Sequence, residues 1–341
     1  MPDNKTQEWF SRLALFGACF AVLVIILGAF TRLADAGLGC PDWPGCYGHL
    51  LWPNEAEEIA RANLAFPDAP VELDKTWPEM VHRYLATTLG VITIALVFLA
   101  WRQRQQGQPL KLPVFLLGFI ILQGLFGMWT VTLKLWPQVV TAHLLGGFVT
   151  LSLLWLLAMR LSNWRWLVSD TELPAILRLR SWVLVGLLIL FAQIALGGWT
   201  TSNYAAVACP DLPVCQGQWW PTMDWRAGFD IAQQVGPNYL GGVMDNEARV
   251  AIHMAHRLGA IITTIYLAVL CFGLWRLPIS GGKRMSLCIG SLLVVQLALG
   301  LGNILFHFPL SVAVAHNAVG ALLLLAMVTL CYRVLTVGTD R

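Results

Sequence analysis

Long runs of apolar residues separated by shorter polar stretches dominate the chain. The runs lie at residues 10–31, 78–101, 112–133, 138–159, 181–201, 250–275, 285–306 and 309–332. Each is close to the ~20 residues that a helix needs to cross a bilayer. Because backbone groups in lipid must bond to one another, runs of this length predict helices. We therefore expect an all-α polytopic membrane protein with eight transmembrane helices. Residues 54–66 predict, more weakly, a short helix on the membrane surface.

Composition agrees with a membrane location. Of the 341 residues, 57% are hydrophobic and only 12% are charged, against about 25% charged in soluble domains. The net charge of +3 is too small to indicate a nucleic-acid partner, so membrane lipid is the expected surroundings. The first apolar run is longer than the apolar region of a signal peptide and lacks a following small-residue cleavage site. It predicts a retained first helix and a bacterial inner membrane.

The basic residues predict the orientation. They gather in the segments on the side of the N-terminus, notably Arg102, Arg104, Lys111, Arg160, Arg165, Arg178, Arg180, Arg276, Lys283 and Arg284. By the positive-inside rule, both termini are cytoplasmic. The long loops at about 32–77 and 202–249 then face outward, and they are rich in acidic residues.

An internal repeat divides the chain. The pattern C-P-D-x-P-x-C-x-G occurs twice at an offset of 169 residues, E-M-V-H-R at 79–83 matches H-M-A-H-R at 253–257, and A-H at 142–143 matches A-H at 315–316. Matches in one order at nearly one offset indicate duplication. We expect two tandem four-helix bundles related by a pseudo-twofold axis along the membrane normal. The predicted parts are an N-terminal half (1–160), a cytoplasmic linker (161–180) and a C-terminal half (181–341).

Four of the histidines occupy equivalent places: His82, His143, His256 and His316. Each lies a few residues inside the second or fourth helix of its half, at a shallow depth of roughly 6–11 Å. Two imidazoles on facing helices suit axial ligation of one haem iron. Polar residues that bond across helices and a proton relay remain alternatives. Zinc fits less well, since each half offers one histidine pair and a single nearby carboxylate.

Charged residues accompany these histidines. Arg83 and Arg257 each follow a histidine, which predicts a salt bridge to a haem propionate; snorkelling to the interface is the alternative. Glu79 shares a helix face with His82, whereas its counterpart in the second half is His253, whose role is open. A carboxylate beside a haem can accept a proton or stabilise positive charge. We therefore expect chemistry in the first half and electron transfer in the second, unless Glu79 merely pairs with Arg83.

The cysteines fall into two groups. The C-x5-C pairs Cys40–Cys46 and Cys209–Cys215 lie in loops expected to face an oxidising compartment, which predicts disulfides. A redox role for the first pair is left open. The remaining cysteines lie within helices and are expected to be small apolar core residues: Cys19, Cys271, Cys288 and Cys331. His49 and His307, in or beside outer loops, are expected at the surface.

Taken together, these motifs resemble the haem A synthase family from about residue 12 to 333. The features that carry the resemblance are E-x-x-H-R at 79–83, H-R at 256–257, the partner histidines and both C-x5-C loops. The resemblance implies oxidation of the C8 methyl group of haem O to the formyl group of haem A by successive hydroxylations. It implies that His82 and His143 bracket the substrate haem, with Glu79 as the catalytic carboxylate. His256 and His316 would ligate a resident haem b.

Bis-histidine ligation leaves no open iron site for O2, so we expect outer-sphere oxidation with water as the oxygen source and Glu79 stabilising the developing positive charge. A di-haem b-type electron-transfer protein and a haem transporter or assembly factor are the competing interpretations. The family also leads us to expect a haem O synthase and oxidase assembly factors as partners, and a homo-oligomer is left open.

Overall fold

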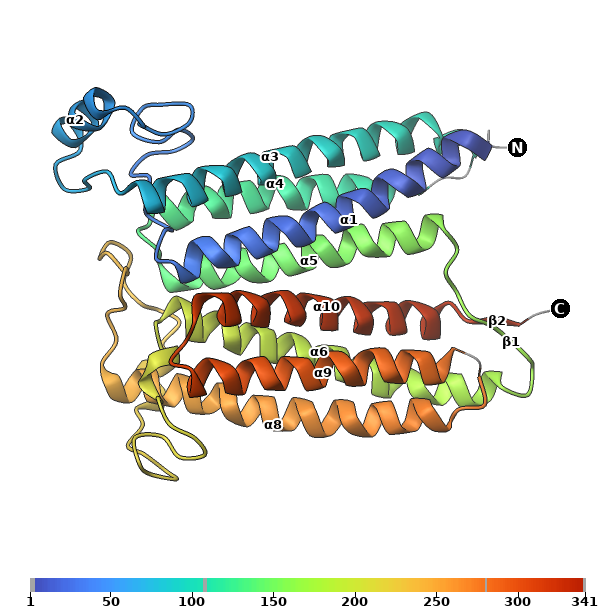
Figure 1. The fold of residues 1–341 in the computed structure, drawn as a ribbon. Helices are drawn as coiled ribbons and strands as arrows, with labels where there is room; N and C mark the ends of the chain where they lie inside the picture. The colour runs from blue at the N-terminus through green and yellow to red at the C-terminus, as the bar shows by residue number, and fades with distance from the viewer. Residues whose placement is uncertain (1–3, 107–108, 280, 340–341) are drawn as a thin grey trace.

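The computed structural model describes residues 4–106, 109–279 and 281–339, and these residues are mainly helical (Figure 1). Within this part of the chain, eight helices are long and apolar enough to cross a membrane, which confirms the predicted fold class. They are α1 (Asn4–Leu33), α3 (Leu73–Arg102), α4 (Lys111–Thr132), α5 (Pro137–Leu161), α6 (Leu173–Ser202), α8 (Asn246–Arg276), α9 (Gly282–Leu305) and α10 (Leu310–Leu335).

Several helices extend beyond the apolar runs that predict them. Helix α3 begins at Leu73 rather than at residue 78 and carries Pro78 in its second turn. Helix α6 begins at Leu173, so the expected linker 161–180 includes its first turns. The difference arises because backbone hydrogen bonds continue a helix into water, whereas hydropathy marks only the part that crosses lipid.

The short elements lie outside the transmembrane segments. Helix α2 (Ala56–Ala65) forms within the expected region 54–66, and Glu55 and Glu58 complete a capping box at its start. The others are η1 (Arg104–Gln106), η2 (Ala206–Ala208) and α7 (Trp225–Gly228). The sequence did not predict the two-residue strands β1 (Leu167–Val168) and β2 (Gly338–Thr339), which pair in parallel and join the segment between the halves to the C-terminal segment.

The transmembrane helices form two groups of four, one above the other in Figure 1. In the first group, α1 and α4 each pack against both α3 and α5; in the second, α6 and α9 each pack against both α8 and α10. The histidine-bearing helices α3 and α5 are therefore diagonally opposite, as are α8 and α10. The groups meet where α1 and α5 pack against α10 and α5 packs against α6.

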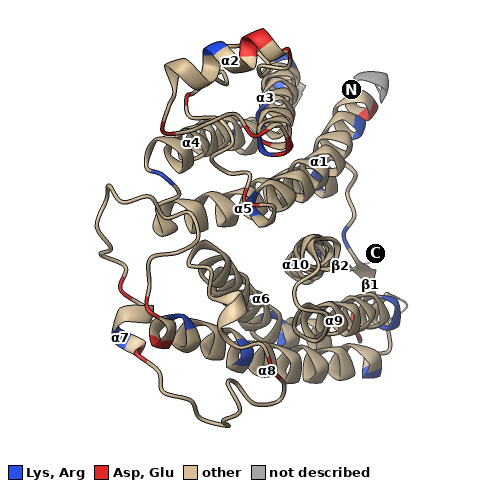
Figure 2. Cartoon of the chain, turned by 60° about the vertical axis from the view of Figure 1, so that its left-hand side comes forward, with Lys and Arg blue, Asp and Glu red and all other residues tan. Residues whose placement is uncertain are grey.

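The N- and C-terminal ends of the described chain lie at the same end of the molecule, and the two long loops lie at the other (Figure 1). In Figure 2 the blue and red residues lie mainly in the loops and toward helix ends, and most of the helical ribbon is tan, the colour of the uncharged residues. This distribution fits a bilayer around the middle of the helices.

The free cysteines differ from expectation in two cases. Cys331 is buried and Cys271 is partly buried, but Cys19 and Cys288 are exposed on the outside of the helix bundles. The expectation of core positions was wrong for these two. A small apolar thiol is accommodated equally well against lipid, so hydropathy alone does not distinguish the two environments.

Candidate functional site

The first histidine pair comes together inside the N-terminal bundle. The ring centres of His82 on α3 and His143 on α5 are 6.4 Å apart, and the ring planes are nearly perpendicular at 87°. A metal–imidazole bond is ~2 Å long, so two imidazoles on opposite sides of one iron have ring centres about 6 Å apart. The separation therefore fits a shared haem iron.

Each of the four histidines packs against a glycine on a neighbouring helix. A Cβ atom at Gly28 would lie 2.7 Å from the Cε1 atom of His82. The corresponding distances are 3.4 Å for Gly127 and His143, 3.2 Å for Gly197 and His256, and 3.2 Å for Gly300 and His316. In each bundle, the helices that carry the paired histidines thus alternate with the helices that carry the glycines packed against them. This close packing sets the positions of the four imidazoles.

Three of the four imidazoles have a ring nitrogen without a hydrogen-bond partner. The Nδ1 atoms of His82, His143 and His316 are buried and make no hydrogen bond within the described protein. A buried polar atom without a partner is costly. Neutral imidazole nitrogens are ligands for iron. The donor set and its unpaired nitrogens therefore fit a haem at the first pair, and the unpaired Nδ1 of His316 fits a haem ligand in the second.

His253, one turn before His256, faces a different environment. Its side chain is buried, and Nδ1 donates a hydrogen bond to the main-chain oxygen of Ala205, 3.0 Å away. Ala205 immediately precedes η2. His253 thus ties α8 to the segment that follows α6, which gives a structural role to the residue whose role the sequence left open.

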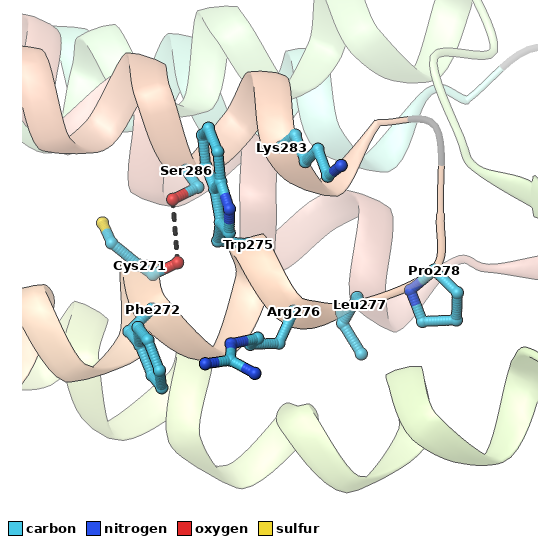
Figure 3. A pocket seen from close by; sticks show the side chains of 8 residues that line it. All are labelled: Cys271, Phe272, Trp275, Arg276, Leu277, Pro278, Lys283 and Ser286. Carbon is cyan, nitrogen blue, oxygen red and sulfur yellow. Dashed lines mark hydrogen bonds between the residues drawn. The ribbon is translucent and has the colours of Figure 1, made fainter.

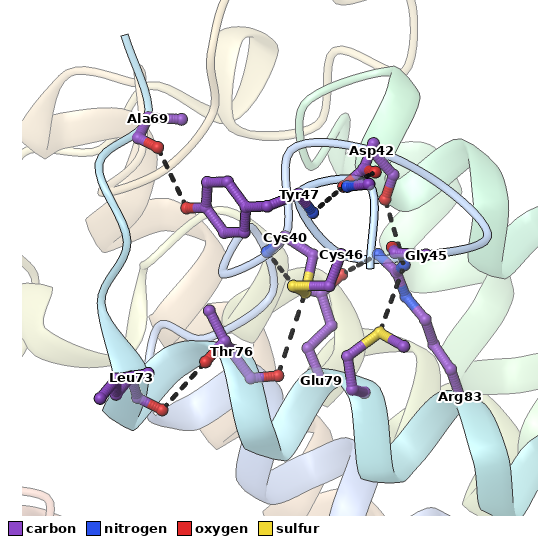
Figure 4. The surroundings of a disulfide bond; sticks show 12 residues. Cys40, Asp42, Gly45, Cys46, Tyr47, Ala69, Leu73, Thr76, Glu79 and Arg83 are labelled. Carbon is purple, nitrogen blue, oxygen red and sulfur yellow. Dashed lines mark hydrogen bonds and ion pairs between the residues drawn. A yellow bond between two sulfur atoms is a disulfide. The ribbon is translucent and has the colours of Figure 1, made fainter. Parts of the chain in front are cut away.

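Glu79 and Arg83 bind the first disulfide loop (Figure 4). One carboxylate oxygen of Glu79 accepts a hydrogen bond from the main-chain N–H of Cys40 at 2.9 Å, and the other pairs with Arg83. Arg83 also donates to the main-chain oxygens of Asp42, Pro44 and Gly45, at 3.1, 3.2 and 2.6 Å. The pairing of Glu79 with Arg83, the alternative that the sequence left open, is therefore present.

Arg257 holds the second loop in the same way. It donates to the main-chain oxygens of Cys209, Asp211 and Val214, at 3.0, 2.8 and 2.9 Å. Both arginines thus bind loop carbonyl groups, a role that the sequence did not reveal because it depends on backbone geometry. The expected propionate contact stays a prediction beside this role.

The two C-x5-C loops have the same internal construction. Disulfides join Cys40 to Cys46 and Cys209 to Cys215, and all four cysteines are fully buried. The peptide bonds before Pro44 and Pro213 are both cis. The motif aspartate in each loop accepts hydrogen bonds from two main-chain N–H groups: Asp42 from Tyr47 and Gly48, and Asp211 from Gln216 and Gly217.

Two charge effects follow from these loops. The N–H groups of Gly217 and then Gln216 hold the pKa of Asp211 below its ordinary value. Burial, reinforced by the charge of Glu72, raises the pKa of Tyr47 to about 12. The neutral Tyr47 hydroxyl donates to the main-chain oxygen of Ala69 at 3.0 Å, which fastens the first loop to the segment after α2.

The other predicted surface residues lie away from the paired histidines. His307 is exposed, and Nδ1 of His49 lies 4.0 Å from the carboxylate of Glu58 near the start of α2. A surface pocket lies at the opposite end of the molecule from the disulfide loops, around the turn between α8 and α9 (Figure 3). Its lining, which includes Trp275, Arg276 and Lys283, contains none of the predicted site residues.

Three glutamines beside the histidines were not predicted from the sequence. Gln123, Gln193 and Gln296 each stand four residues before the glycine that packs against a histidine. A detectable signal existed, because Q-x-x-x-G in α4 and α9 recurs at the offset of 173 residues that also relates His143 to His316.

Comparisons with known proteins find relatives along nearly the whole chain. The family model described as cytochrome oxidase assembly protein (COX15-CtaA) matches residues 11–328. A Heme A synthase of Shewanella oneidensis is 47% identical over 325 residues, covering 95% of each chain. The Heme A synthase of Caulobacter vibrioides is 27% identical over 92% of each chain, and that of Halalkalibacterium halodurans is 26% identical over 99% of each.

Proposed function

Since the chain belongs to the cytochrome oxidase assembly protein family, we propose that it is a haem A synthase. The proposed reaction is oxidation of the C8 methyl group of haem O to the formyl group of haem A, which makes the protein an oxidoreductase. The observation that carries the proposal is the close pair of His82 and His143 inside the first bundle of a chain 47% identical to a Heme A synthase over 95% of its length.

The two pairs take different haems in this proposal. His82 and His143 hold the substrate, haem O, and their ring separation of 6.4 Å supports shared ligation. His256 and His316 would hold a resident haem b, which their equivalent packing against Gly197 and Gly300 supports. Bound haem b supplies one-electron transfer.

Of the two arginines, Arg257 retains an unpaired nitrogen for the proposed propionate contact. The Nε atom of Arg257 is buried and has no hydrogen-bond partner within the described residues. Arg83 has its terminal nitrogens on loop carbonyl groups and on Glu79. A propionate at either place would therefore share the arginine with the disulfide loop.

Glu79 is the proposed catalytic carboxylate. It lies three residues before His82 on α3, and its pairing with Arg83 and the Cys40 N–H group fixes its position. A fixed carboxylate stabilises positive charge that develops as electrons leave the methyl carbon, and it can accept a proton. Water then supplies the oxygen atom, and each of the two hydroxylations releases two protons and two electrons, which an external electron acceptor takes up. Formyl oxygen that derives from labelled O2, without exchange from water, would contradict this route.

We place the protein in a bacterial inner membrane with both termini in the cytoplasm. In this orientation the disulfide loops lie in an oxidising compartment, where disulfides persist. Haem O would arrive from a haem O synthase, and the product would pass to oxidase assembly factors.

One experiment tests the proposal against a protein that only transfers electrons or transports haem. The chain is expressed together with a haem O synthase, and extracted haems are separated by chromatography and identified by mass. We expect haem A or its hydroxylated precursor. Recovery of only haem B and haem O, from a chain that binds both, would favour electron transfer or transport.

A further inference from the structure

Glutamine side chains lie beside the histidine sites at three of the four positions. The Nε2 atom of Gln193 is 3.1 Å from Nδ1 of His256 and donates to the main-chain oxygen of the same residue at 3.0 Å. The Nε2 atom of Gln296 is 3.2 Å from Nε2 of His316. The backbone of Gln123 interacts with the imidazole of His143.

Each glutamine fills a space left by a glycine on the histidine-bearing helix. A Cβ atom at Gly146, one turn after His143, would lie 1.8 Å from Nε2 of Gln123. A Cβ atom at Gly259, one turn after His256, would lie 2.2 Å from Oε1 of Gln193. Gly320 bears the same relation to Gln296, at 3.4 Å from Nε2. The glutamine and the glycine therefore belong to one arrangement.

The surroundings of His82 lack this arrangement. The counterpart of Gln193 at the repeat offset of 169 residues is Val24, and the counterpart of Gly259 at the offset of 174 is Leu85. Both the glutamine and the glycine that would make room for it are thus replaced. The imidazole of His82 interacts with the backbone of Val24, as that of His143 does with the backbone of Gln123, so the two sites differ in the side chain and not in this backbone contact.

The glutamines also carry an unused acceptor. The Oε1 atoms of Gln123, Gln193 and Gln296 are buried and make no hydrogen bond within the described chain. A metal-bound imidazole donates its remaining N–H group to an acceptor that fixes the ring and increases its basicity. A half-turn of the amide exchanges its nitrogen and oxygen, so that Oε1 can accept this hydrogen bond.

We propose that Gln123, Gln193 and Gln296 are positioning residues for the haem-ligating histidines beside them. His82, which lacks such a residue, is the ligand that dissociates from the iron when the substrate haem is exchanged. This inference rests on the proposed function. A resident haem must stay, and both of its histidines have a glutamine. A substrate haem must leave after oxidation, and one of its two histidines has none.

The test introduces beside His82 the glutamine and the glycine that the other three histidines have. The double variant Val24→Gln, Leu85→Gly is purified in detergent with haem O and haem b bound, then reduced and mixed with carbon monoxide. Carbon monoxide binds ferrous iron only where an axial ligand has left. Since loss of such a partner weakens metal binding about 10–100-fold, we expect carbon monoxide binding at haem O to slow by a similar factor. An unchanged rate, with both bis-histidine spectra intact, would overturn the inference.

Two single variants provide matched comparisons. Gln193→Leu should weaken haem b retention about 10–100-fold. It should also raise the midpoint potential of haem b, by ~59 mV for each tenfold by which the affinity for ferric haem falls relative to that for ferrous haem. Its carbon monoxide rate at haem O should stay unchanged. An unaltered haem b potential and retention would contradict a positioning role, because a packing residue alone would not shift the potential in this direction.

Gln123→Leu tests which ligand leaves, even if the double variant does not fold. If His82 is the leaving ligand, weakening His143 opens a second route and increases the rate only modestly above that of the wild type. A rise of about 10–100-fold would identify His143 as the leaving ligand and refute the proposal for His82. Failure of the proposed function would differ from both outcomes, since the wild-type chain would then form no haem A.

Discussion

At the scale of single residues, Glu79 combines two tasks that the sequence presented as alternatives. Its carboxylate binds the Cys40 N–H group and pairs with Arg83, so it holds the disulfide loop on α3. It also lies one turn from His82 on the same helix. With an exposure of only 5%, it is shielded from water, which strengthens its electrostatic effect on nearby charge.

Substitution of Glu79 can separate the two tasks. Glu79→Gln keeps an oxygen that can accept from Cys40 but removes the charge, whereas Glu79→Ala removes both. If the charge stabilises the transition state, both variants should lose at least about 100-fold in haem A formation, as when one electrostatic group is removed from an active site. Haem b absorbance should remain. Activity in Glu79→Gln close to wild type would assign Glu79 to loop anchoring alone.

The histidine pairs predict selective loss of haem. His316→Ala removes one axial ligand from the second half, so purified protein should lose the bis-histidine spectrum of haem b while still binding added haem O. His143→Ala should have the opposite effect. Optical and paramagnetic resonance spectra of the two purified variants measure this difference. Equal loss of both haems in both variants would contradict separate sites.

At the scale of elements, the C-x5-C loops are rigid units built around an aspartate. Asp211 accepts from the N–H groups of Gln216 and Gly217, both at 2.7 Å, and Arg257 binds the loop from α8. Asp42 occupies the equivalent position in the first loop. The same contacts in both loops show that the duplicated sequence pattern preserves backbone hydrogen bonding.

Asp211→Ala should loosen the second loop. Its N–H partners would lose their acceptor, and Cys209–Cys215, now fully buried, should be reduced faster by dithiothreitol, as measured by thiol alkylation and mass spectrometry. Asp42→Ala is the matched variant and should affect only Cys40–Cys46.

The contribution of Asp211 to stability should depend on pH. Because the folded protein lowers the pKa of Asp211, the carboxylate contributes fully to stability above the pKa that it has in the unfolded chain. The effect is lost as pH falls through the lower folded value.

The elements also show what the sequence could and could not predict. Apolar runs located every transmembrane helix because lipid leaves no other backbone arrangement. They missed helix ends such as Leu73, where the helix continues among polar residues. The repeat located the paired histidines, but the role of Arg257 depends on loop carbonyl groups that side-chain patterns do not encode. The lipid-facing position of Cys19 was missed because lipid and protein interior are equally apolar.

At the scale of the whole molecule, side-chain contacts join the two halves at both ends. Near the disulfide loops, Arg32 at the end of α1 donates to the Tyr204 hydroxyl at 2.9 Å and to the main-chain oxygen of Thr201 at 2.7 Å. Toward the other end, the indole of Trp155 donates to Thr329 at 2.8 Å. Electron transfer between the proposed haems requires a fixed separation, and these contacts hold the two bundles in one arrangement.

Arg32→Ala should therefore destabilise the assembly of the halves more than a surface change of the same type. The Arg32 side chain is only 13% exposed. Its removal takes away both of its hydrogen bonds, to the Tyr204 hydroxyl and to the Thr201 carbonyl, so we expect a loss of about 2 kcal/mol in unfolding free energy. Arg12→Ala is the control, because Arg12 and Glu8 form an exposed pair within one helix that contributes less than about 1 kcal/mol. Thermal unfolding in detergent measures both variants. If Arg32 also keeps the bundles aligned for electron transfer, its variant should lose haem A formation below its unfolding temperature, whereas Arg12→Ala should not. Equal stability and activity in the two variants would assign the alignment of the halves to the apolar contacts between α1, α5, α6 and α10.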